Sequence, residues 1–223
     1  LELAEMVKYA DNTWHALKVT FANEIGSLAK AQGLDGHRVM DILCADTKLN
    51  LSPAYLRPGF AFGGSCLPKD LRALTALAHA HGLPVPLLSS VLESNRAVIE
   101  AAATRIADSG KIRIGLAGLS FKAETDDVRE SPLVELVKLL IDRGLAVRIY
   151  DPNVDPAKLV GVNREQLLRR LPDFDTLRVA TLRNLLSESD LIVIGTTAPE
   201  FREIQEQAGP GIQIIDLTGG NWS

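Results

Sequence analysis

The chain has 223 residues, of which 46% are hydrophobic and 23% charged, a balance typical of globular proteins. Its formal net charge of −4 gives no reason to expect a nucleic-acid partner. No apolar run approaches the roughly 20 residues that span a bilayer, and no signal peptide is recognisable, so we expect a cytoplasmic protein without a membrane segment. Cys44 and Cys66 lack zinc-site spacing and fit a reducing compartment, and the four scattered histidines form no metal-ligand pattern.

The first predicted element is a helix over residues 3 to about 32, where Leu3, Trp14 and Leu28 belong to an apolar stripe at helical spacing. Gly33 ends it, as glycine commonly does at a helix C-terminus. Such a helix is long for a globular protein and must bury its stripe against other helices or a second subunit. We therefore expect a homodimer formed through this helix. The chain starts inside the helical pattern, without an initiating methionine or a cap, and we interpret it as a fragment.

The same helix carries a polar stripe. Its members fall within roughly 60° of Lys8 around the helix axis, and they are Lys8, Asn12, His15 and Asn23. Solvent alone selects a polar face on a surface helix, although solvated faces are usually richer in glutamate and lysine. Amide and imidazole groups also suit contacts with a ligand, so the pattern by itself favours neither interpretation.

Further helices are predicted before the period of the sequence changes. They cover residues 35–44, 70–80 and 87–107, and Ser109-Gly110 closes this part of the chain. The first domain is therefore expected to be all helical and to span residues 1–108.

A loop from residue 46 to 64 separates the second of these helices from the third. Tyr55, Arg57 and Phe60 could simply anchor it. Arg57 is the least comfortable as an ordinary surface residue, because the guanidinium fork suits a phosphate or a sugar hydroxyl.

The loop leads into the sequence Arg57-Pro-Gly-Phe-Ala-Phe-Gly-Gly-Ser-Cys66-Leu-Pro-Lys-Asp70. Glycines before a nucleophile let a ligand approach the backbone, and Pro68 can open a helix directly after the cysteine. A helix N-terminus and a nearby lysine both favour the thiolate, which is the reactive form of cysteine. Most free cysteines are small buried hydrophobic residues. This segment is a poor core sequence, however, so we interpret Cys66 as a nucleophile.

From Lys111 onward the pattern is that of strands alternating with helices. Strands are predicted at residues 111–119, 146–150, 191–195 and 212–217, and Ser131-Pro132 caps and opens one of the intervening helices. This alternation indicates parallel βαβ units and a doubly wound, Rossmann-like sheet over residues 109–223.

The sheet lacks a dinucleotide-binding fingerprint. Gly115-x-x-Gly118 is not the full GxGxxG pattern, and the connection to the next helix is too long for a tight phosphate turn. Asp151, after the second strand, could bind a ribose or simply form an Asp-Pro turn. Lys122 and Arg129 lie beside a helix N-terminus, which suits a phosphate, although such a charged loop is equally typical of solvated surface.

The cysteine motif resembles the active-site motif of the UDP-glucose/GDP-mannose dehydrogenase family, and its wording is closest to the GDP-mannose branch. The segment from Gly118 to Pro132, which contains Lys122 and Arg129, is similar to the C-terminal motif of that family. The resemblance covers nearly the whole chain. It implies an all-helical central dimerisation domain and a Rossmann-like domain that binds a sugar nucleotide. It also implies that the N-terminal NAD-binding domain of the family is absent from this chain.

The resemblance assigns roles to individual residues. Cys66 would form a thiohemiacetal and then a thioester with C6 of the sugar. Asp70 would assist the activation of the hydrolytic water or the positioning of the lysine. Lys8 and Asn12 would stabilise the oxyanion. Substrate contacts are implied for His15, Asn23, Tyr55, Arg57, Phe60, Gly63 and Lys122, and contacts with NAD for Lys69 and Arg129.

Family members oxidise a primary alcohol at C6 of a sugar nucleotide to a carboxylate, using two NAD per turnover. The resemblance therefore implies oxidation of GDP-mannose to GDP-mannuronate in a bacterial alginate-type pathway, with a UDP-sugar such as UDP-glucose as the alternative substrate. A different class of function is a sugar-nucleotide-binding or dimerising module without catalysis. Intact Cys66, Lys69 and Asp70 favour the dehydrogenase, because a binding module needs no cysteine here. Without the N-terminal domain we expect no turnover by this chain alone.

Overall fold

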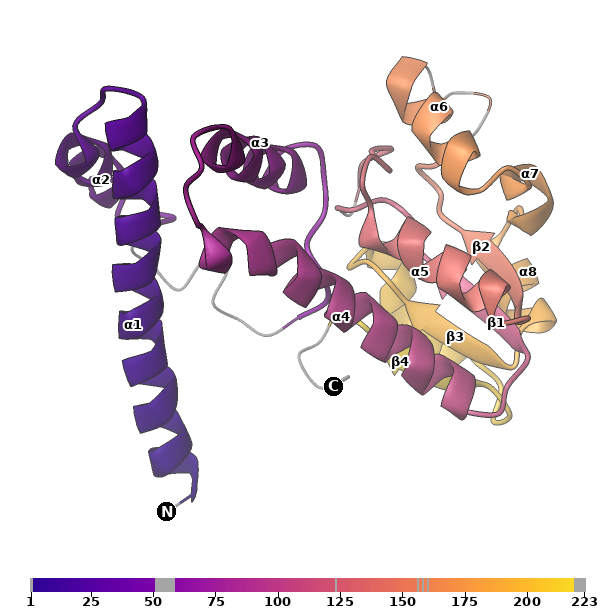
Figure 1. Ribbon diagram of the computed structural model, residues 1–223. Helices are drawn as coiled ribbons and strands as arrows, with labels where there is room; N and C mark the ends of the chain where they lie inside the picture. Colours follow the sequence, from indigo (N-terminus) through magenta and orange to yellow (C-terminus); the bar gives the residue numbers. More distant parts are fainter. Residues whose placement is uncertain are drawn as a thin grey trace. The chain divides into compact units, whose positions relative to one another are not determined.

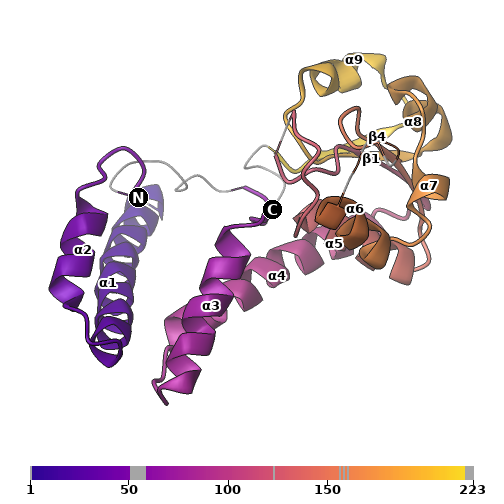
Figure 2. The same ribbon diagram turned by 90° about the horizontal axis from the view of Figure 1, so that it is seen from above.

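The computed structural model describes residues 2–50, 59–122, 124–155, 157, 159 and 161–218 (Figure 1 and Figure 2). The chain forms two compact units, one made of Leu1–Arg57 and Lys69–Glu93 and the other of Pro58–Pro68 and Ser94–Ser223. The second unit thus includes the loop that carries Cys66. As a point along the sequence, the boundary near residue 108 stays a prediction.

The first part of the chain is helical, as predicted. Its helices are α1 (Glu2–Ala31), α2 (Gly36–Cys44), α3 (Leu67–Ala80) and α4 (Pro86–Asp108). Each lies within one turn of its predicted bounds. The Asp35 carboxylate caps α2 by accepting hydrogen bonds from the backbone N–H groups of His37 and Arg38.

The core of the first unit joins α1, α3 and the start of α4 through Leu28, Ala78 and Leu88. A buried acid strengthens this junction: Glu24 of α1 accepts hydrogen bonds from the backbone N–H groups of Leu87 at 2.9 Å and Leu88 at 3.1 Å. Both N–H groups belong to the first turn of α4, where no helical carbonyl can accept them. Glu24 therefore caps a helix that lies more than sixty residues further along the chain.

The second unit is built on a parallel sheet in the order β2-β1-β3-β4. Its elements after α4 are β1 (Arg113–Ala117), α5 (Pro132–Asp142), β2 (Ala146–Tyr150), α6 (Gly161–Arg170), α7 (Phe174–Leu177), α8 (Leu182–Glu188), β3 (Leu191–Ile194), η1 (Pro199–Glu203), α9 (Ile204–Gln207) and β4 (Gln213–Asp216). All three strand pairs are parallel. The predicted doubly wound α/β fold is thus confirmed.

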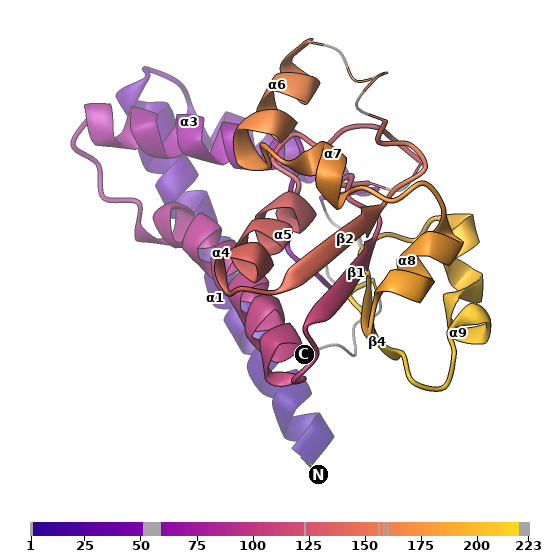
Figure 3. The ribbon, with the colours of Figure 1, turned by 90° about the vertical axis from the view of Figure 1, so that its right-hand side faces the viewer.

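Helices cover both faces of this sheet (Figure 3). One cluster of buried side chains joins the sheet to α5 and to the part of α4 from Ile99 to Ile106. A second cluster, on the other face, joins β3 to α8 through Leu185 and to the η1–α9 segment through Phe201 and Ile204. The sheet is therefore buried on both sides, which is why its strands read as nearly continuous apolar runs. Among the helices described, none combines the length and apolar character needed to cross a bilayer.

Candidate functional site

The strand order reverses between β1 and β3, because the chain moves from β1 to β2 on one side and places β3 and β4 on the other. In open parallel sheets, ligands bind outside the carboxyl ends of the strands at such a point. A cavity of about 290 Å³ lies there. It is lined by Phe60, Ala61, Phe121, Lys122, Pro132, Leu133, Gly195, Thr196, Thr197, Leu217 and Thr218. Two of these side chains, Phe60 and Lys122, are among the predicted substrate contacts.

The segment after β1, which carries Phe121 and Lys122, is held by a buried aspartate. One carboxylate oxygen of Asp151 accepts hydrogen bonds from the backbone N–H groups of Leu119 at 2.8 Å and Ser120 at 3.1 Å. The other accepts the N–H of Asn153 at 2.9 Å. Asp151 is only 5% exposed, and both its oxygens bind backbone. Of the two sequence interpretations, the structure thus favours the structural acid over the ribose ligand.

An asparagine holds the next part of the same segment. In α6, the Asn163 side chain accepts a hydrogen bond from the Val128 N–H at 3.1 Å and donates one to the Asp126 carbonyl at 2.7 Å. Between those two points the Asp127 carboxylate accepts from Nε and Nη2 of Arg129, at 2.8 and 2.7 Å. The Asn163 contacts and this ion pair fix the direction of the guanidinium.

This ion pair sets the charges of its members. The hydrogen bond from Arg129 lowers the pKa of Asp127 below its ordinary value. The pKa of Arg129 is raised, first by the hydrogen bond and charge of Asp127, and to a smaller extent by the charge of Cys66. Both groups of the pair are therefore ionised near neutral pH, and Arg129 lies within electrostatic range of the cysteine.

The loop that carries Cys66 packs against the sheet unit. A Cβ on Gly63 would lie 2.4 Å from the Glu130 carbonyl oxygen and 2.6 Å from Cδ of Pro132. A Cβ on Gly64, whose φ is +87°, would lie 2.9 Å from the ring of Phe121. The glycines were expected to admit a ligand, but in this structure protein atoms occupy the space beside them. The assignment of Gly63 as a substrate contact through its backbone stays a prediction.

Cys66 itself is exposed and stands directly before α3, which begins at Leu67. The predicted place of the thiol at a helix N-terminus is confirmed. Lys69 and Asp70 occupy the first turn of α3 and pair at 3.3 Å, with both side chains about two-thirds exposed (67% and 68%). They belong to the other compact unit, so their roles toward the cysteine stay predictions.

Six predicted site residues lie partly or wholly outside the description. The backbone of α1 is described, but the side chains of Lys8, Asn12, His15 and Asn23 are not. Tyr55 and Arg57 lie outside the described residues altogether. Of the predicted site residues that the structure describes, five belong to the same compact unit: Phe60, Gly63, Cys66, Lys122 and Arg129. Phe60 and Lys122 line one cavity in it.

Sequence reasoning missed two residues that hold this site: Asn95, whose side chain bonds the backbone N–H and carbonyl of Phe62, and Asn163. It anticipated Asp151 as a ribose ligand or a turn residue, but not its bonds to Leu119 and Ser120. For Asn95 and Asn163 a signal existed, because asparagine inside a helix competes with the helix for backbone hydrogen bonds and needs a reason to be there. Nothing in the sequence, however, showed which distant backbone groups each side chain would bind.

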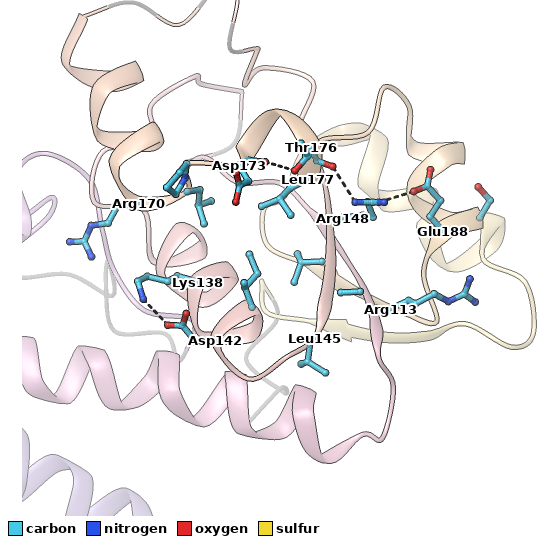
Figure 4. A pocket seen from close by; sticks show the side chains of 16 residues that line it. Arg113, Lys138, Asp142, Leu145, Arg148, Arg170, Asp173, Thr176, Leu177 and Glu188 are labelled. Carbon is cyan, nitrogen blue, oxygen red and sulfur yellow. Dashed lines mark hydrogen bonds and ion pairs between the residues drawn. The ribbon is translucent and has the colours of Figure 1, made fainter.

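A larger cavity of about 680 Å³ lies along the open edge of β2 (Figure 4). Its cations are already paired with acceptors: Arg148 donates to Glu188 at 2.8 Å and to the Thr176 carbonyl at 3.1 Å, and Lys138 donates to Asp142 at 2.6 Å. It holds none of the predicted site residues, and we assign it no chemistry. No group of three potential metal ligands occurs among the described residues.

Models of a known protein family match most of the chain. Residues 2–97 match the model of the UDP-glucose/GDP-mannose dehydrogenase family, central domain, and residues 115–217 match the UDP binding domain of the same family. The chain is 50% identical over 219 residues to GDP-mannose 6-dehydrogenase of Pseudomonas putida, covering 98% of this chain and 50% of that protein. It is 32% identical over 208 residues to a UDP-glucose 6-dehydrogenase of Haloferax volcanii, covering 92% of this chain and 45% of that protein.

Solved structures of nucleotide-sugar dehydrogenases also resemble the chain. A ternary complex of GDP-mannose dehydrogenase from Pseudomonas aeruginosa has a TM-score of 0.91 at 48% identity, over 99% of this chain and 50% of that one. A UDP-glucose dehydrogenase from Pyrobaculum islandicum has a TM-score of 0.63 at 33% identity, over 98% of this chain and 48% of that one. The chain spans about half the length of the curated relatives that it matches. Since two consecutive domain models of one family account for most of its length, the chain belongs to the UDP-glucose/GDP-mannose dehydrogenase family.

Proposed function

We propose that this chain supplies the nucleophile and the sugar-nucleotide site of an NAD-dependent GDP-mannose 6-dehydrogenase. The observation that carries the proposal is the packing of the Cys66 loop on the sheet unit, at the edge where Lys122 lines a cavity. The higher identity to GDP-mannose dehydrogenases than to UDP-glucose dehydrogenases favours the guanosine sugar over the uridine sugar.

The proposed chemistry is a four-electron oxidation at C6 of the mannose. Bound NAD would supply the oxidising equivalents for both two-electron oxidations, and Lys69 and Arg129 would contact its edge. After the first, the Cys66 thiolate attacks the aldehyde carbon and forms a thiohemiacetal, whose oxyanion Lys8 and Asn12 stabilise. After the second, the carbon is a thioester of Cys66. Water then displaces the thiolate, Asp70 assists the attack, and the product is GDP-mannuronate.

The described residues fit only the edge of a cofactor site. Gly115 and Gly118 serve packing, since a Cβ would lie 2.5 Å from Oγ of Ser189 in the first case and 2.4 Å from Oγ1 of Thr196 in the second. The first turn of α5 is capped by Ser131, which accepts the Leu133 N–H at 3.2 Å. A pyrophosphate therefore finds no glycine-rich turn here. We propose Arg129 and Lys69 as edge contacts with NAD, and we expect no NADH formation by this chain alone.

Binding of GDP-mannose to the 223-residue chain tests the proposal. Isothermal titration calorimetry should show measurable binding, and Lys122→Ala should weaken it about tenfold or more, because a charge-assisted contact contributes about 1.5–3 kcal/mol. Arg57→Ala should have a similar effect. Cys66→Ser should change the affinity little, since the thiolate acts in the reaction and not in ground-state binding.

Lys138→Ala is the matched control for this titration, because Lys138 lines the other cavity and pairs with Asp142. It should bind GDP-mannose like the parent chain. If Lys122→Ala and Arg57→Ala both bind with the affinity of the parent chain, the assignment of the sugar-nucleotide site is wrong. NADH formation by this chain alone would refute the expectation that it does not turn over by itself. UDP-glucose bound more tightly than GDP-mannose would support the alternative substrate.

We also propose that the chain forms a homodimer through α1. The exposed side chains of Leu3, Val7, Trp14 and Leu17 lie within about 80° of one another around this helix. Analytical ultracentrifugation at tens of micromolar should give a dimer, and Val7→Glu should shift it toward monomer. The control is Val162→Glu, which places the same charge on an equally exposed valine of α6. A monomeric parent chain would contradict the proposal.

A further inference from the structure

The cysteine-bearing loop is tied to α4 by one side chain. Asn95 donates a hydrogen bond from Nδ2 to the Phe62 carbonyl and accepts one at Oδ1 from the Phe62 N–H, both at 2.9 Å. The two bonds satisfy the backbone N–H and carbonyl of Phe62, as a neighbouring strand would. We call this pair of hydrogen bonds the clamp. Asn95 is half-buried, and Phe62 stands four residues before Cys66 in the chain. The clamp therefore acts on backbone immediately upstream of the nucleophile.

The clamp and the two glycines act on adjacent residues. Asn95 holds Phe62, and the next two residues, Gly63 and Gly64, press against Glu130, Pro132 and the ring of Phe121. The loop is thus fixed between α4 on one side and the segment that carries Lys122 and Arg129 on the other. Only Ser65 separates Gly64, the last residue of this fixed backbone, from Cys66. The clamp therefore acts close to the point from which the Cys66 side chain projects.

The clamp needs a side-chain amide, which can both donate and accept a hydrogen bond. An aspartate at the same position could accept the Phe62 N–H but could not donate to its carbonyl when ionised, and alanine could do neither. Asparagine is also a poor residue for a helix interior. The loop it holds has no helix or strand from residue 59 to 64 and contains three glycines, which lose the most conformational freedom on ordering.

We propose that Asn95 is the positioning residue of Cys66: it holds the loop so that the thiol lies directly before the start of α3. This inference deepens the proposed function and rests on it for the role of Cys66 as a nucleophile. Asn95 acts through the backbone of Phe62.

The experiment measures the loop and the thiol separately in the 223-residue chain. Amide hydrogen exchange at Phe62 reports the clamp, and the rate of alkylation by iodoacetamide reports the thiol. Cys44 provides an internal reference because it is also free and exposed. The parent chain should alkylate at Cys66 well before Cys44. In Asn95→Ala, exchange at Phe62 should accelerate about tenfold, the effect of losing one hydrogen bond. Alkylation of Cys66 should slow at least about threefold, with Cys44 unchanged.

Asn95→Asp keeps the acceptor for the Phe62 N–H and should fall between the parent and Asn95→Ala. The control is Asn184→Ala, which removes an asparagine near the start of α8, remote in sequence from this loop; both cysteines should react in it as in the parent. An unchanged Cys66 rate despite faster exchange at Phe62 would overturn the proposal. So would an equal change at both cysteines, which indicates general loosening. If the parent chain does not bind GDP-mannose, while Asn95→Ala still changes exchange at Phe62 and alkylation of Cys66, the result would count against the proposed function alone.

Discussion

Replacing Asp151 with alanine is expected to cost about 3–5 kcal/mol of unfolding free energy in the sheet unit, because it leaves three backbone N–H groups without their acceptor. The N–H groups of Leu119 and Ser120 are the critical ones, since both residues are buried. Chemical denaturation followed by circular dichroism measures the loss. Amide exchange at Leu119 and Ser120 shows whether it begins at this segment.

Two further variants serve as comparisons for Asp151→Ala, one graded and one a control. Asp151→Asn keeps one acceptor oxygen and should lose roughly half as much stability. Asp175→Ala removes an exposed aspartate at α7 and should stay within about 0.5 kcal/mol of the parent. Because Asp151 also supports the segment that carries Lys122, GDP-mannose binding should weaken in Asp151→Ala. An unchanged denaturation midpoint with unchanged exchange at both amides would show that the buried carboxylate does not hold this segment.

Gly63→Ala is expected to detach the cysteine-bearing loop from the sheet unit at a cost of about 1–3 kcal/mol. The new methyl group would meet a backbone carbonyl oxygen and a proline ring atom, at 2.4 and 2.6 Å, and no side-chain rotation relieves either contact. The loop must move instead, which should accelerate amide exchange at Phe62 and alter the alkylation rate of Cys66.

The matched control lies in the same loop. Gly59 has nothing within 4 Å of an added Cβ, so Gly59→Ala adds the same methyl group without a clash. It should leave both readouts at their parental values. If Gly63→Ala matched Gly59→Ala in exchange and alkylation, the close packing of this loop would not be what places the cysteine.

The helices and strands were predictable because each signal is local. The apolar spacing of α1, the Ser131-Pro132 start of α5 and the apolar runs of the strands depend only on near neighbours in the chain. The cysteine motif was equally readable, since a cysteine behind two glycines and before a proline describes a nucleophile at a helix N-terminus. The structure confirms that position directly before Leu67.

What the tertiary structure decided are the contacts between residues far apart in the chain. The sequence by itself determined the fold class, the family and the identity of Cys66, Lys122 and Arg129 as candidates. It could not show that the cysteine loop packs against the rest of the sheet unit. That packing depends on the close approach of Gly63 to Pro132 and of Gly64 to the Phe121 ring. It also could not show which backbone groups Asn95 and Asp151 would bind. Those hydrogen bonds exist only once the chain has brought partners more than thirty residues apart into contact.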